Sequence, residues 1–286
     1  MATDLLKEIV LGTVQFGLNY GISNETGQTP PNEVSEILKF AWYNGLSTLD
    51  TAYSYGTSEA VLGECMETDF NIITKFPYEN DIAIIEKNFY QSLKLLKQKQ
   101  VYGLLIHDAD SFIKQPKIWD LLQVFKKDGF VKKIGFSLYY PKELELLLSF
   151  GYTPDLIQIP YNLLDRRFEP YFNELKLKGC EIHVRSVFLQ GLFFLNPNML
   201  SNFFDDVKPI IKDLRQTFQS NEELSSFLIR TCLNSKIDKV VIGVNNLSQL
   251  QNIVSGLSIP HKQFDIHVDH LNIDDKIILP FNWPKQ

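Results

Sequence analysis

The segment that decides the fold reads VLGTVQF at residues 10–16 and continues directly into GLNYG at residues 17–21. Its first part is a short, largely apolar run, which is typical of a strand in a parallel sheet. In an open dinucleotide-binding sheet, such a first strand leads into a turn with the spacing GxGxxG. Gly17 and Gly21 do not have that spacing. The segment therefore favours a closed barrel over an open, doubly wound sheet.

Seven further short runs along the chain have the same character. Most are continuous apolar stretches, as expected for strands that are covered on both faces. The expected strands are Val10–Phe16, Ser47–Ala52, Asn71–Phe76, Val101–His107, Lys133–Leu138, Leu156–Pro160, Glu181–Val187 and Lys239–Val244.

Longer segments with helical periodicity separate these runs. After Pro31, apolar residues follow the i, i+3, i+4, i+7 spacing, and Gly45 closes the segment. The other expected helices are Ile85–Leu96, Ile118–Phe125, Pro141–Phe150, Phe168–Lys178, Glu222–Asn234 and Leu247–Gly256, with an additional one around Asp205–Thr217. The alternation predicts the α/β class and a (β/α)8 TIM barrel with extra helices, formed as a single domain by residues 1–286.

Composition limits the class of protein further. A chain of 286 residues with 44% hydrophobic residues can bury a large core. Its net charge is −6 and it shows no basic stripe, which argues against a nucleic-acid partner. No apolar stretch reaches the roughly 18 residues that cross a bilayer, and the N-terminus does not resemble a signal peptide. The three cysteines have no paired spacing, which argues against a disulfide framework or a metal site. We therefore expect a cytoplasmic protein without a membrane partner.

Polar side chains gather where three consecutive expected strands end. Asp50, Lys75 and His107 stand near the ends of these strands, and Tyr55 follows in the loop after Asp50. Active sites of such barrels form at the C-terminal ends of the strands. An ammonium group beside a tyrosine lowers the pKa of the phenol from about 10, and a carboxylate keeps the ammonium charged and in place. A histidine can orient a carbonyl oxygen by a hydrogen bond.

This set predicts polarisation and protonation of a carbonyl group. The hydride that completes a reduction comes from no side chain, so a nicotinamide cofactor is implied. Taken singly, the residues have simpler explanations: Asp50 as a loop or cap residue, Tyr55 as a packing residue, and His107 as a core histidine. Lys75 is harder to explain by packing, because a buried lysine is rare without a partner. The four together are hard to explain by packing alone.

Several stretches make the chain resemble the aldo-keto reductase family. They occur in the order typical of the family and cover nearly the whole chain, and the DTAxxYG block is the most specific of them. They are LGTVQFG at Leu11–Gly17, LDTAYSYGTSEAVLG at Leu49–Gly63, ITKF at Ile73–Phe76, LLIHD at Leu104–Asp108, IGFSLY at Ile134–Tyr139, IQIPYN at Ile157–Asn162, LQGL at Leu189–Leu192 and VIGVNNLSQL at Val241–Leu250.

The resemblance implies a role for each matching residue. Tyr55 would be the general acid, Lys75 would lower its pKa, Asp50 would pair with Lys75, and His107 would orient the substrate. The matching cofactor-binding positions are Gly12, Thr13, Asp50, Ser137, Gln158, Arg185, Ser186, Phe188, Gln190, Gly191, Gly243, Asn245, Asn246 and Gln249. Of these, Ser137 and Gln158 would hold the nicotinamide carboxamide, the loop from Ser186 would follow the pyrophosphate, and the last group would contact the adenosine end.

Three positions depart from the family pattern. Leu138 stands where many members carry asparagine, and Arg185 stands where many carry an aromatic residue that stacks on the nicotinamide. An arginine can stack as well, or its charge can bind a phosphate or an acidic substrate. Asn245 stands about where NADP-specific members place a basic residue, and an amide lacks the charge that binds a phosphate. We still expect NADP(H) in preference to NAD(H).

The expected activity is reduction of a small carbonyl substrate, such as a sugar-derived aldehyde or ketone. Two alternatives remain at this stage. One is a catalytically silent nucleotide-binding module of the same fold, and the other is a barrel enzyme that uses Lys75 as a Schiff base. The sequence carries no signal for the oligomeric state.

Overall fold

Eight parallel strands close into a barrel in the order in which they occur along the chain. The computed structural model describes residues 2–77, 79, 81–233, 236–259 and 273–284. The strands are β1 Ile9–Gly12, β2 Thr48–Asp50, β3 Asn71–Phe76, β4 Val101–Ile106, β5 Val131–Ser137, β6 Leu156–Pro160, β7 Glu181–Arg185 and β8 Lys239–Gly243. Strand β8 pairs with β1 and closes the ring, which confirms the expected (β/α)8 barrel.

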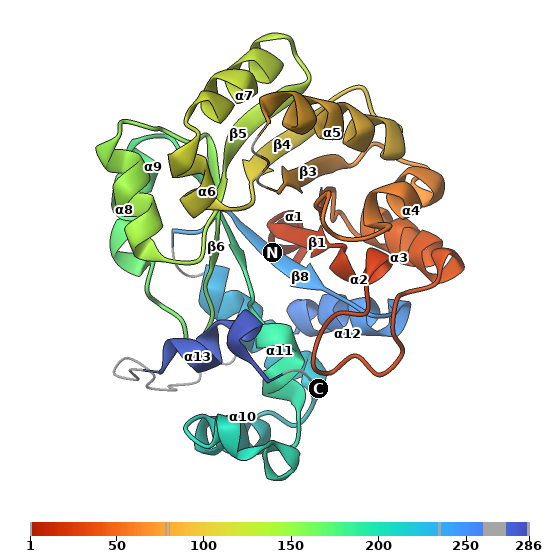
Figure 1. Cartoon of the computed structure of the whole chain (residues 1–286). Helices are drawn as coiled ribbons and strands as arrows, with labels where there is room; N and C mark the ends of the chain where they lie inside the picture. The colour runs from red at the N-terminus through yellow and green to blue at the C-terminus, as the bar shows by residue number, and fades with distance from the viewer. Residues whose placement is uncertain (1, 78, 80, 234–235, 260–272, 285–286) are drawn as a thin grey trace.

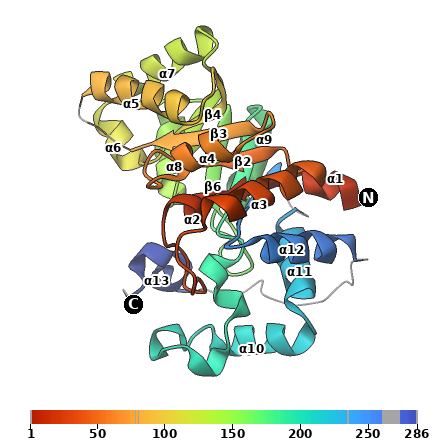
Figure 2. The ribbon, with the colours of Figure 1, turned by 90° about the vertical axis from the view of Figure 1, so that its right-hand side faces the viewer.

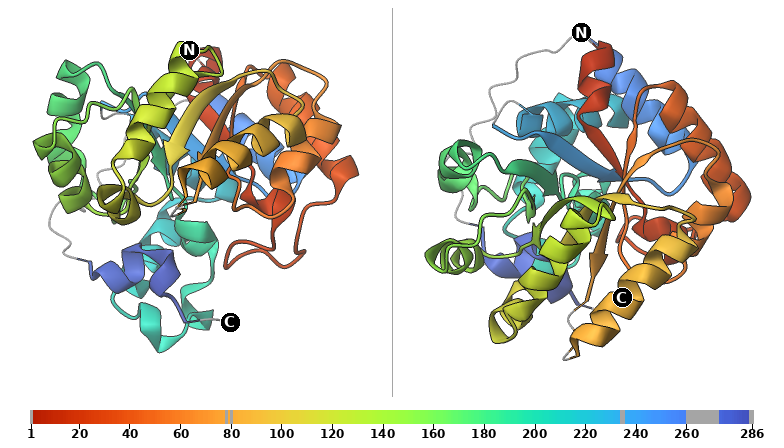
Figure 3. Two further views of the ribbon diagram at one scale, coloured as in Figure 1. Left: turned by 45° about the horizontal axis from the view of Figure 1, so that its top comes forward. Right: turned by 90° about the horizontal axis from the view of Figure 1, so that it is seen from above.

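Helices surround the strands (Figures 1 and 3). The α-helices are α1 Ala2–Lys7, α2 Val14–Gly17, α3 Pro31–Tyr43, α4 Ser58–Cys65, α5 Ile82–Leu95, α6 Ala109–Lys114, α7 Lys117–Lys127, α8 Pro141–Ser149, α9 Phe172–Leu177, α10 Lys208–Thr217, α11 Asn221–Leu233, α12 Leu247–Ser258 and α13 Asp275–Ile278. Five short 3-10 helices are η1 Glu169–Tyr171, η2 Leu189–Phe194, η3 Pro197–Met199, η4 Asn202–Phe204 and η5 Pro280–Asn282. In Figure 2, α1 lies to the right of the barrel, while α2 and α6, which follow strands, lie to the left.

The structure corrects several expected element bounds. Strand β1 ends at Gly12 instead of Phe16, because the backbone of Thr13 turns to donate to Asp50 O and a short helix follows. Phe16 is buried on that helix, so its apolar character resembled a continued strand. The strands expected to reach His107, Leu138 and Val187 end one or two residues earlier, and helix α4 was not expected at all. The additional helix expected between β7 and β8 is α10, which lies apart from the barrel in Figures 1 and 2.

Local sequence explains how individual helices begin and end. Helix α3 starts at Pro31, whose fixed φ suits the first helical position, and Gly45 follows the helix with φ of +86°. Helix α5 begins after Asp81, whose side chain accepts a hydrogen bond from the amide of Ala83. Both helices bury one apolar face against the outside of the barrel, because their apolar residues recur with the helical period.

The barrel interior is apolar at its centre and polar at both ends. Ile73, Leu105 and Leu156 form the central interior cluster. Above it, towards the C-terminal ends of the strands, Asp50 and Lys75 are buried. The strands are staggered, so that Asp50 pairs along the backbone with Ile73 and not with Lys75. Lys75 stands two residues beyond Ile73 on the same face of β3, so its long side chain reaches Asp50 diagonally across the strand pair.

A second polar cluster fills the opposite end of the barrel, at the N-terminal ends of β4, β5 and β7. The Glu181 carboxylate accepts hydrogen bonds from the Tyr102 hydroxyl at 2.7 Å, from His183 Nε2 at 2.7 Å, and from the Lys133 ammonium. Burial alone would raise the pKa of Glu181. The donors His183, Lys133 and Tyr102 outweigh burial and hold it well below its ordinary value of 4.5. This cluster lies at the N-terminal ends of the strands, where side chains of such barrels contribute to stability and not to catalysis.

The variant Glu181→Gln should be less stable than the wild-type protein by about 2–4 kcal/mol near neutral pH, because three donors, of which His183 is fully buried, lose a charged acceptor. The pKa of Glu181 is lowered in the folded state, so its contribution is present above the unfolded pKa and is lost as the pH falls. Urea denaturation of both proteins at several pH values checks this. The stability difference should shrink below about pH 4.5, and a difference that is independent of pH would contradict it.

Candidate active site

A buried ion pair lies at the mouth of the barrel. Lys75 Nζ donates to Asp50 Oδ2 at 2.7 Å, and the two side chains are 0% and 4% exposed. The ammonium also donates to the backbone oxygen of Thr51 at 2.8 Å and to the Tyr55 hydroxyl at 3.4 Å. The second oxygen of Asp50 accepts from Gln158 Nε2 at 2.7 Å. The structure thus brings together Asp50, Tyr55 and Lys75, as the sequence predicted.

Two glycines bring the Tyr55 loop against the loop that follows β1. A Cβ atom on Gly17 would lie 1.8 Å from Tyr55 O, so no larger residue fits there without displacing the backbone. Gly56 has φ of +59°, and a Cβ atom there would lie 2.5 Å from Gly17 O. The buried Ser58 hydroxyl ties the two loops further by donating to Thr13 O at 2.9 Å. The glycines therefore fix the height at which Tyr55 stands above Lys75.

Electrostatics keep the Tyr55 phenol protonated. Burial, and next the Asp50 carboxylate, raise the pKa of Tyr55 well above its ordinary value of 10, while the Arg185 guanidinium lowers it. Burial outweighs the neighbouring charges, so the net shift of the Tyr55 pKa is upward, and the lowering of this pKa by Lys75 stays a prediction. The Lys75 ammonium is itself affected: burial lowers its pKa and the Asp50 carboxylate raises it. Tyr55 is therefore a stable proton donor across the neutral range.

His107 stands beside Tyr55. Their ring centroids are 6.0 Å apart in an edge-on arrangement, and His107 Nδ1 lies 3.3 Å from the Ser54 hydroxyl. Burial, and then the charges of Lys75 and Arg185, lower the pKa of His107 to about 3. The ring is therefore neutral at physiological pH, with one nitrogen available as a donor.

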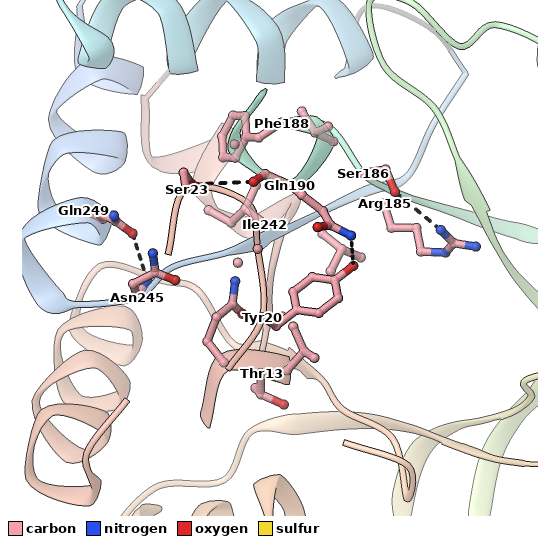
Figure 4. Close-up of a pocket in the computed structure, with 18 of the residues that line it drawn as sticks. Thr13, Tyr20, Ser23, Arg185, Ser186, Phe188, Gln190, Ile242, Asn245 and Gln249 are labelled. Carbon is pink, nitrogen blue, oxygen red and sulfur yellow. Dashed lines mark hydrogen bonds between the residues drawn. The ribbon is translucent and has the colours of Figure 1, made fainter. Parts of the chain in front are cut away.

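A cavity of about 500 Å³ opens above these groups (Figure 4). Most of the residues predicted to bind a cofactor or act in catalysis line it. They are Gly12, Thr13, Asp50, Tyr55, His107, Arg185, Ser186, Phe188, Gln190, Gly191, Gly243, Asn245 and Gln249. Lys75, Ser137 and Gln158 lie buried beneath the cavity wall. Asn246 is not on the wall: its side chain caps helix α12 by accepting from the amide of Gln249.

Two buried side chains near the mouth of the barrel each have a polar atom without a hydrogen bond. Among the described residues, Ser137 Oγ and Gln158 Oε1 have no hydrogen-bond partner. The two residues are neighbours in register on β5 and β6. Buried polar groups are almost always hydrogen-bonded, so these two atoms suit a ligand that offers donors and acceptors. A nicotinamide carboxamide has both, and the residues present therefore fit this group.

The loop after β7 follows the cavity in an unusual backbone conformation. Ser186, Leu189, Gln190 and Gly191 all have positive φ, between +46° and +90°. For residues other than glycine this costs energy, and such strain is typically kept at functional sites. Hydrogen bonds with other segments hold this loop: the Asn162 amide donates to Ser186 O at 3.0 Å, and the Ser23 hydroxyl donates to Gln190 O at 3.5 Å. Across the cavity Gln190 Nε2 donates to the Tyr20 hydroxyl at 3.1 Å, as Figure 4 shows.

Sequence reasoning missed several residues of the cavity wall. These are Val14, Gln15, Ser23, Val187, Phe194, Leu195, Asn221, Ser225, Asn252 and Ile253 among others. Gln15 is the most informative of them, because its Oε1 atom is buried without a partner among the described residues. A Cβ atom on Gly243 would lie 2.7 Å from Gln15 Nε2, so a larger residue there would displace the end of the Gln15 side chain. A glutamine inside the largely apolar run 10–16 was the available signal.

Two negative findings concern the described residues. Within the part of the chain that the structure describes, no three His, Cys, Asp or Glu side chains are grouped to hold a metal ion. In that same part, every helix is too short or too polar to cross a membrane.

Comparisons with known proteins agree with this geometry. The sequence model of the Aldo/keto reductase family matches residues 8–267, and the chain belongs to that family. Membership supports an oxidoreductase, and the family uses nicotinamide cofactors on small carbonyl compounds. No protein of curated function matches the chain in sequence.

Solved structures share the fold. The holo form of an aldo-keto reductase from Bacillus halodurans is 20% identical, with a TM-score of 0.71 over 90% of this chain and 88% of that one. The glycerol dehydrogenase from Gluconobacter oxydans is 18% identical, with a TM-score of 0.67 over 89% of this chain and 88% of that one. At these identities the likeness establishes the fold alone.

Proposed function

We propose that this protein reduces an aldehyde or ketone to the alcohol with NAD(P)H, and that Tyr55 donates the proton. The observation that carries the proposal is the chain of contacts from Asp50 through Lys75 to the Tyr55 hydroxyl, at 2.7 and 3.4 Å, at the mouth of a cavity. Packing does not require a buried lysine and a buried aspartate in this place.

Each residue has a distinct part in the proposed reaction. A bound reduced nicotinamide would supply the hydride, and Ser137 and Gln158 would hold its carboxamide. The Tyr55 hydroxyl gives its proton to the carbonyl oxygen, and the Lys75 ammonium stabilises the phenolate that remains. With the Ser54 hydroxyl donating to His107 Nδ1, the Nε2–H of the neutral ring is left to orient the carbonyl oxygen.

Titration of the purified protein with NADPH and with NADH tests the cofactor part of the proposal. Nicotinamide fluorescence should report binding in the submillimolar range for at least one of them. Oxidation of the bound cofactor by a panel of aldehydes and ketones then tests turnover. If neither nucleotide binds, the oxidoreductase proposal fails. If one binds but no carbonyl is ever reduced, the silent binding module becomes the better account.

The preference for NADP(H) stays a prediction. The adenosine end of the cavity is lined by amides, including Asn245, Gln249 and Asn252. Among the described residues of the cavity wall, Arg185 is the one lysine or arginine, and it lies at the other end in Figure 4. Amides can bind ribose hydroxyls, but they lack the charge that favours a 2′-phosphate. The ratio of the dissociation constants for NADPH and NADH tests this preference.

The burial of Lys75 argues against the Schiff-base alternative. Its ammonium is 0% exposed and is held by Asp50, whereas a Schiff-base lysine must reach its carbonyl as a free amine. The choice of substrate is still a proposal: a sugar-derived carbonyl compound was expected. The solved relative named a glycerol dehydrogenase is a precedent for polyol chemistry on this fold, but only in that protein.

The reduction should proceed at a constant kcat/KM between about pH 5 and pH 9. His107, with a pKa of about 3, does not ionise in this range. The raised pKa of Tyr55 keeps the acid protonated as the pH increases, so activity should fall only above its ordinary value of 10. A pH profile of kcat/KM measured with saturating cofactor checks this. A basic limb between about pH 7 and pH 9 would show that Lys75 does lower the pKa of Tyr55 after all.

A further inference from the structure

Arg185 presents an uncompensated positive charge to the cavity. Its guanidinium donates to Leu138 O at 3.0 Å and to the Ser186 hydroxyl at 3.4 Å, and its central carbon lies 4.2 Å from the centroid of the Tyr139 ring. Among the described residues, no carboxylate lies within ion-pair distance of it. These contacts hold the group in place and leave its charge unpaired.

The charges around the mouth do not cancel. Asp50 is the one acid on the cavity wall among the described residues, and both of its oxygens are already engaged, by Lys75 and by Gln158. The Lys75 charge is thereby neutralised, and His107 is neutral. One formal positive charge, that of Arg185, is left. Because the whole protein has a net charge of −6, this positive charge is a local feature of the site.

The position of Arg185 relates it to the reacting end of the cavity. Figure 4 shows Asn245 and Gln249 at one end of the wall and Arg185 at the other, with Tyr20 between them. The guanidinium is close enough to lower the pKa of Tyr55 and of His107, although burial is the larger influence on both. An anion bound by Arg185 would therefore lie beside the carbonyl group and away from the adenosine end.

We propose that Arg185 recognises an anionic group on the substrate, so that the preferred substrates are aldehydes or ketones that carry a carboxylate or phosphate near the carbonyl. This rests on the proposed function. The guanidinium offers a planar fork of donors that matches such oxyanions, and a neutral stacking residue could not do so. The cofactor pyrophosphate is an oxyanion too, and the experiment must separate the two sources.

Matched probes isolate the charge. We would measure kcat/KM for meta- and para-carboxybenzaldehyde and for the corresponding formylbenzamides, which have nearly the same shape without the charge. The wild-type protein should favour one of the acids over its amide by about 30-fold, as for a charge-assisted contact of about 2 kcal/mol. Arg185→Gln should bring the ratio close to one. Arg185→Lys should keep part of the preference, because it keeps the charge and loses the fork.

Two controls separate this effect from others. Lys87→Gln removes the same charge from the exposed face of helix α5, so it should leave the acid-to-amide ratio unchanged. NADPH binding, measured by fluorescence, should be nearly equal in the wild-type and Arg185→Gln proteins. Benzoate and benzamide, tested as inhibitors of the reduction of an uncharged aldehyde, give a second measure that does not require the probe itself to turn over.

The outcomes are distinct. An acid-to-amide ratio that is close to one in the wild-type protein, or that survives Arg185→Gln, overturns the proposal while the reductase function stands. A large loss of NADPH affinity with an unchanged ratio assigns Arg185 to the cofactor phosphates and also overturns it. If the wild-type protein reduces none of the four aldehydes or any other carbonyl, the proposed function fails, and this inference fails with it.

Discussion

Replacement of Tyr55 by phenylalanine should lower kcat/KM for carbonyl reduction by about a thousandfold, which is within the range for loss of a positioned general acid. The Tyr55 hydroxyl is the group that lies 3.4 Å from the Lys75 ammonium on the open side of the ion pair. Among the described residues, Tyr55 is the one tyrosine whose hydroxyl accepts a hydrogen bond from the Lys75 ammonium. Cofactor binding should be preserved, since the substitution removes one oxygen atom. Steady-state kinetics and the fluorescence titration measure the two effects separately.

Tyr171→Phe is the matched control. Tyr171 lies on η1, outside the cavity wall, and its hydroxyl donates to Glu145 on the outer surface. The same chemical change there should leave kcat/KM within a factor of about two, as for most surface substitutions. If Tyr55→Phe kept more than about a tenth of the wild-type activity, Tyr55 would not be the proton donor.

Replacement of Asp50 by asparagine should destabilise the protein by about 3 kcal/mol near neutral pH, because it leaves the buried Lys75 ammonium without its counter-charge. Asparagine has nearly the shape of aspartate, so packing changes little. Burial lowers the pKa of Lys75, and the substitution removes the Asp50 carboxylate, which is the main influence that raises it again. A lysine whose pKa is lower in the folded state than in the unfolded state makes the protein less stable as the pH falls below the unfolded pKa. The deficit should therefore shrink as the pH rises from about 7 towards 10.

A double-mutant cycle isolates this pair. Asp50→Asn combined with Lys75→Met removes both charges and should recover more than half of the lost stability, because no buried charge is left unpaired. Glu64→Gln is the control for an exposed ion pair: Glu64 and Lys97 are 73% and 56% exposed, and such pairs contribute little. Urea denaturation of the four proteins of the cycle measures the coupling. Additive losses from the two single changes would show that the pair is not energetically coupled.

Much of the fold could be predicted from the order of short apolar runs and periodic segments. The bounds of β3 and β6 agree with the expected ranges. The errors fall where a strand passes into the barrel mouth, as at β1, β4 and β7. There the chain remains apolar or carries site residues after it leaves the ladder, so the pattern has no visible break. The helices α2 and α4 were not predicted, because they are short.

The candidate site likewise has a part that could be predicted from the sequence and a part that could not. The titratable residues Asp50, Tyr55, Lys75 and His107 are recognisable in the sequence, since their types are unusual at the ends of apolar strands. Their distances are not, because Asp50 pairs in register with Ile73, and only the pairing of β2 with β3 shows that Lys75, two residues further along, reaches it diagonally. The net upward shift of the Tyr55 pKa was also not predictable from the sequence, because it depends on how deeply the phenol is buried.

By itself, the sequence determined the barrel, the family resemblance and the set of reactive residue types, because these depend on local periodicity and on residue chemistry. The tertiary structure decided which charges are compensated. It joined Asp50 to Lys75 and Gln158, placed the Glu181 carboxylate among three donors at the other end of the barrel, and left Arg185 unpaired beside Tyr139. The physical reason is that compensation of charge depends on distances between strands far apart in the chain, and only the closed barrel sets those distances.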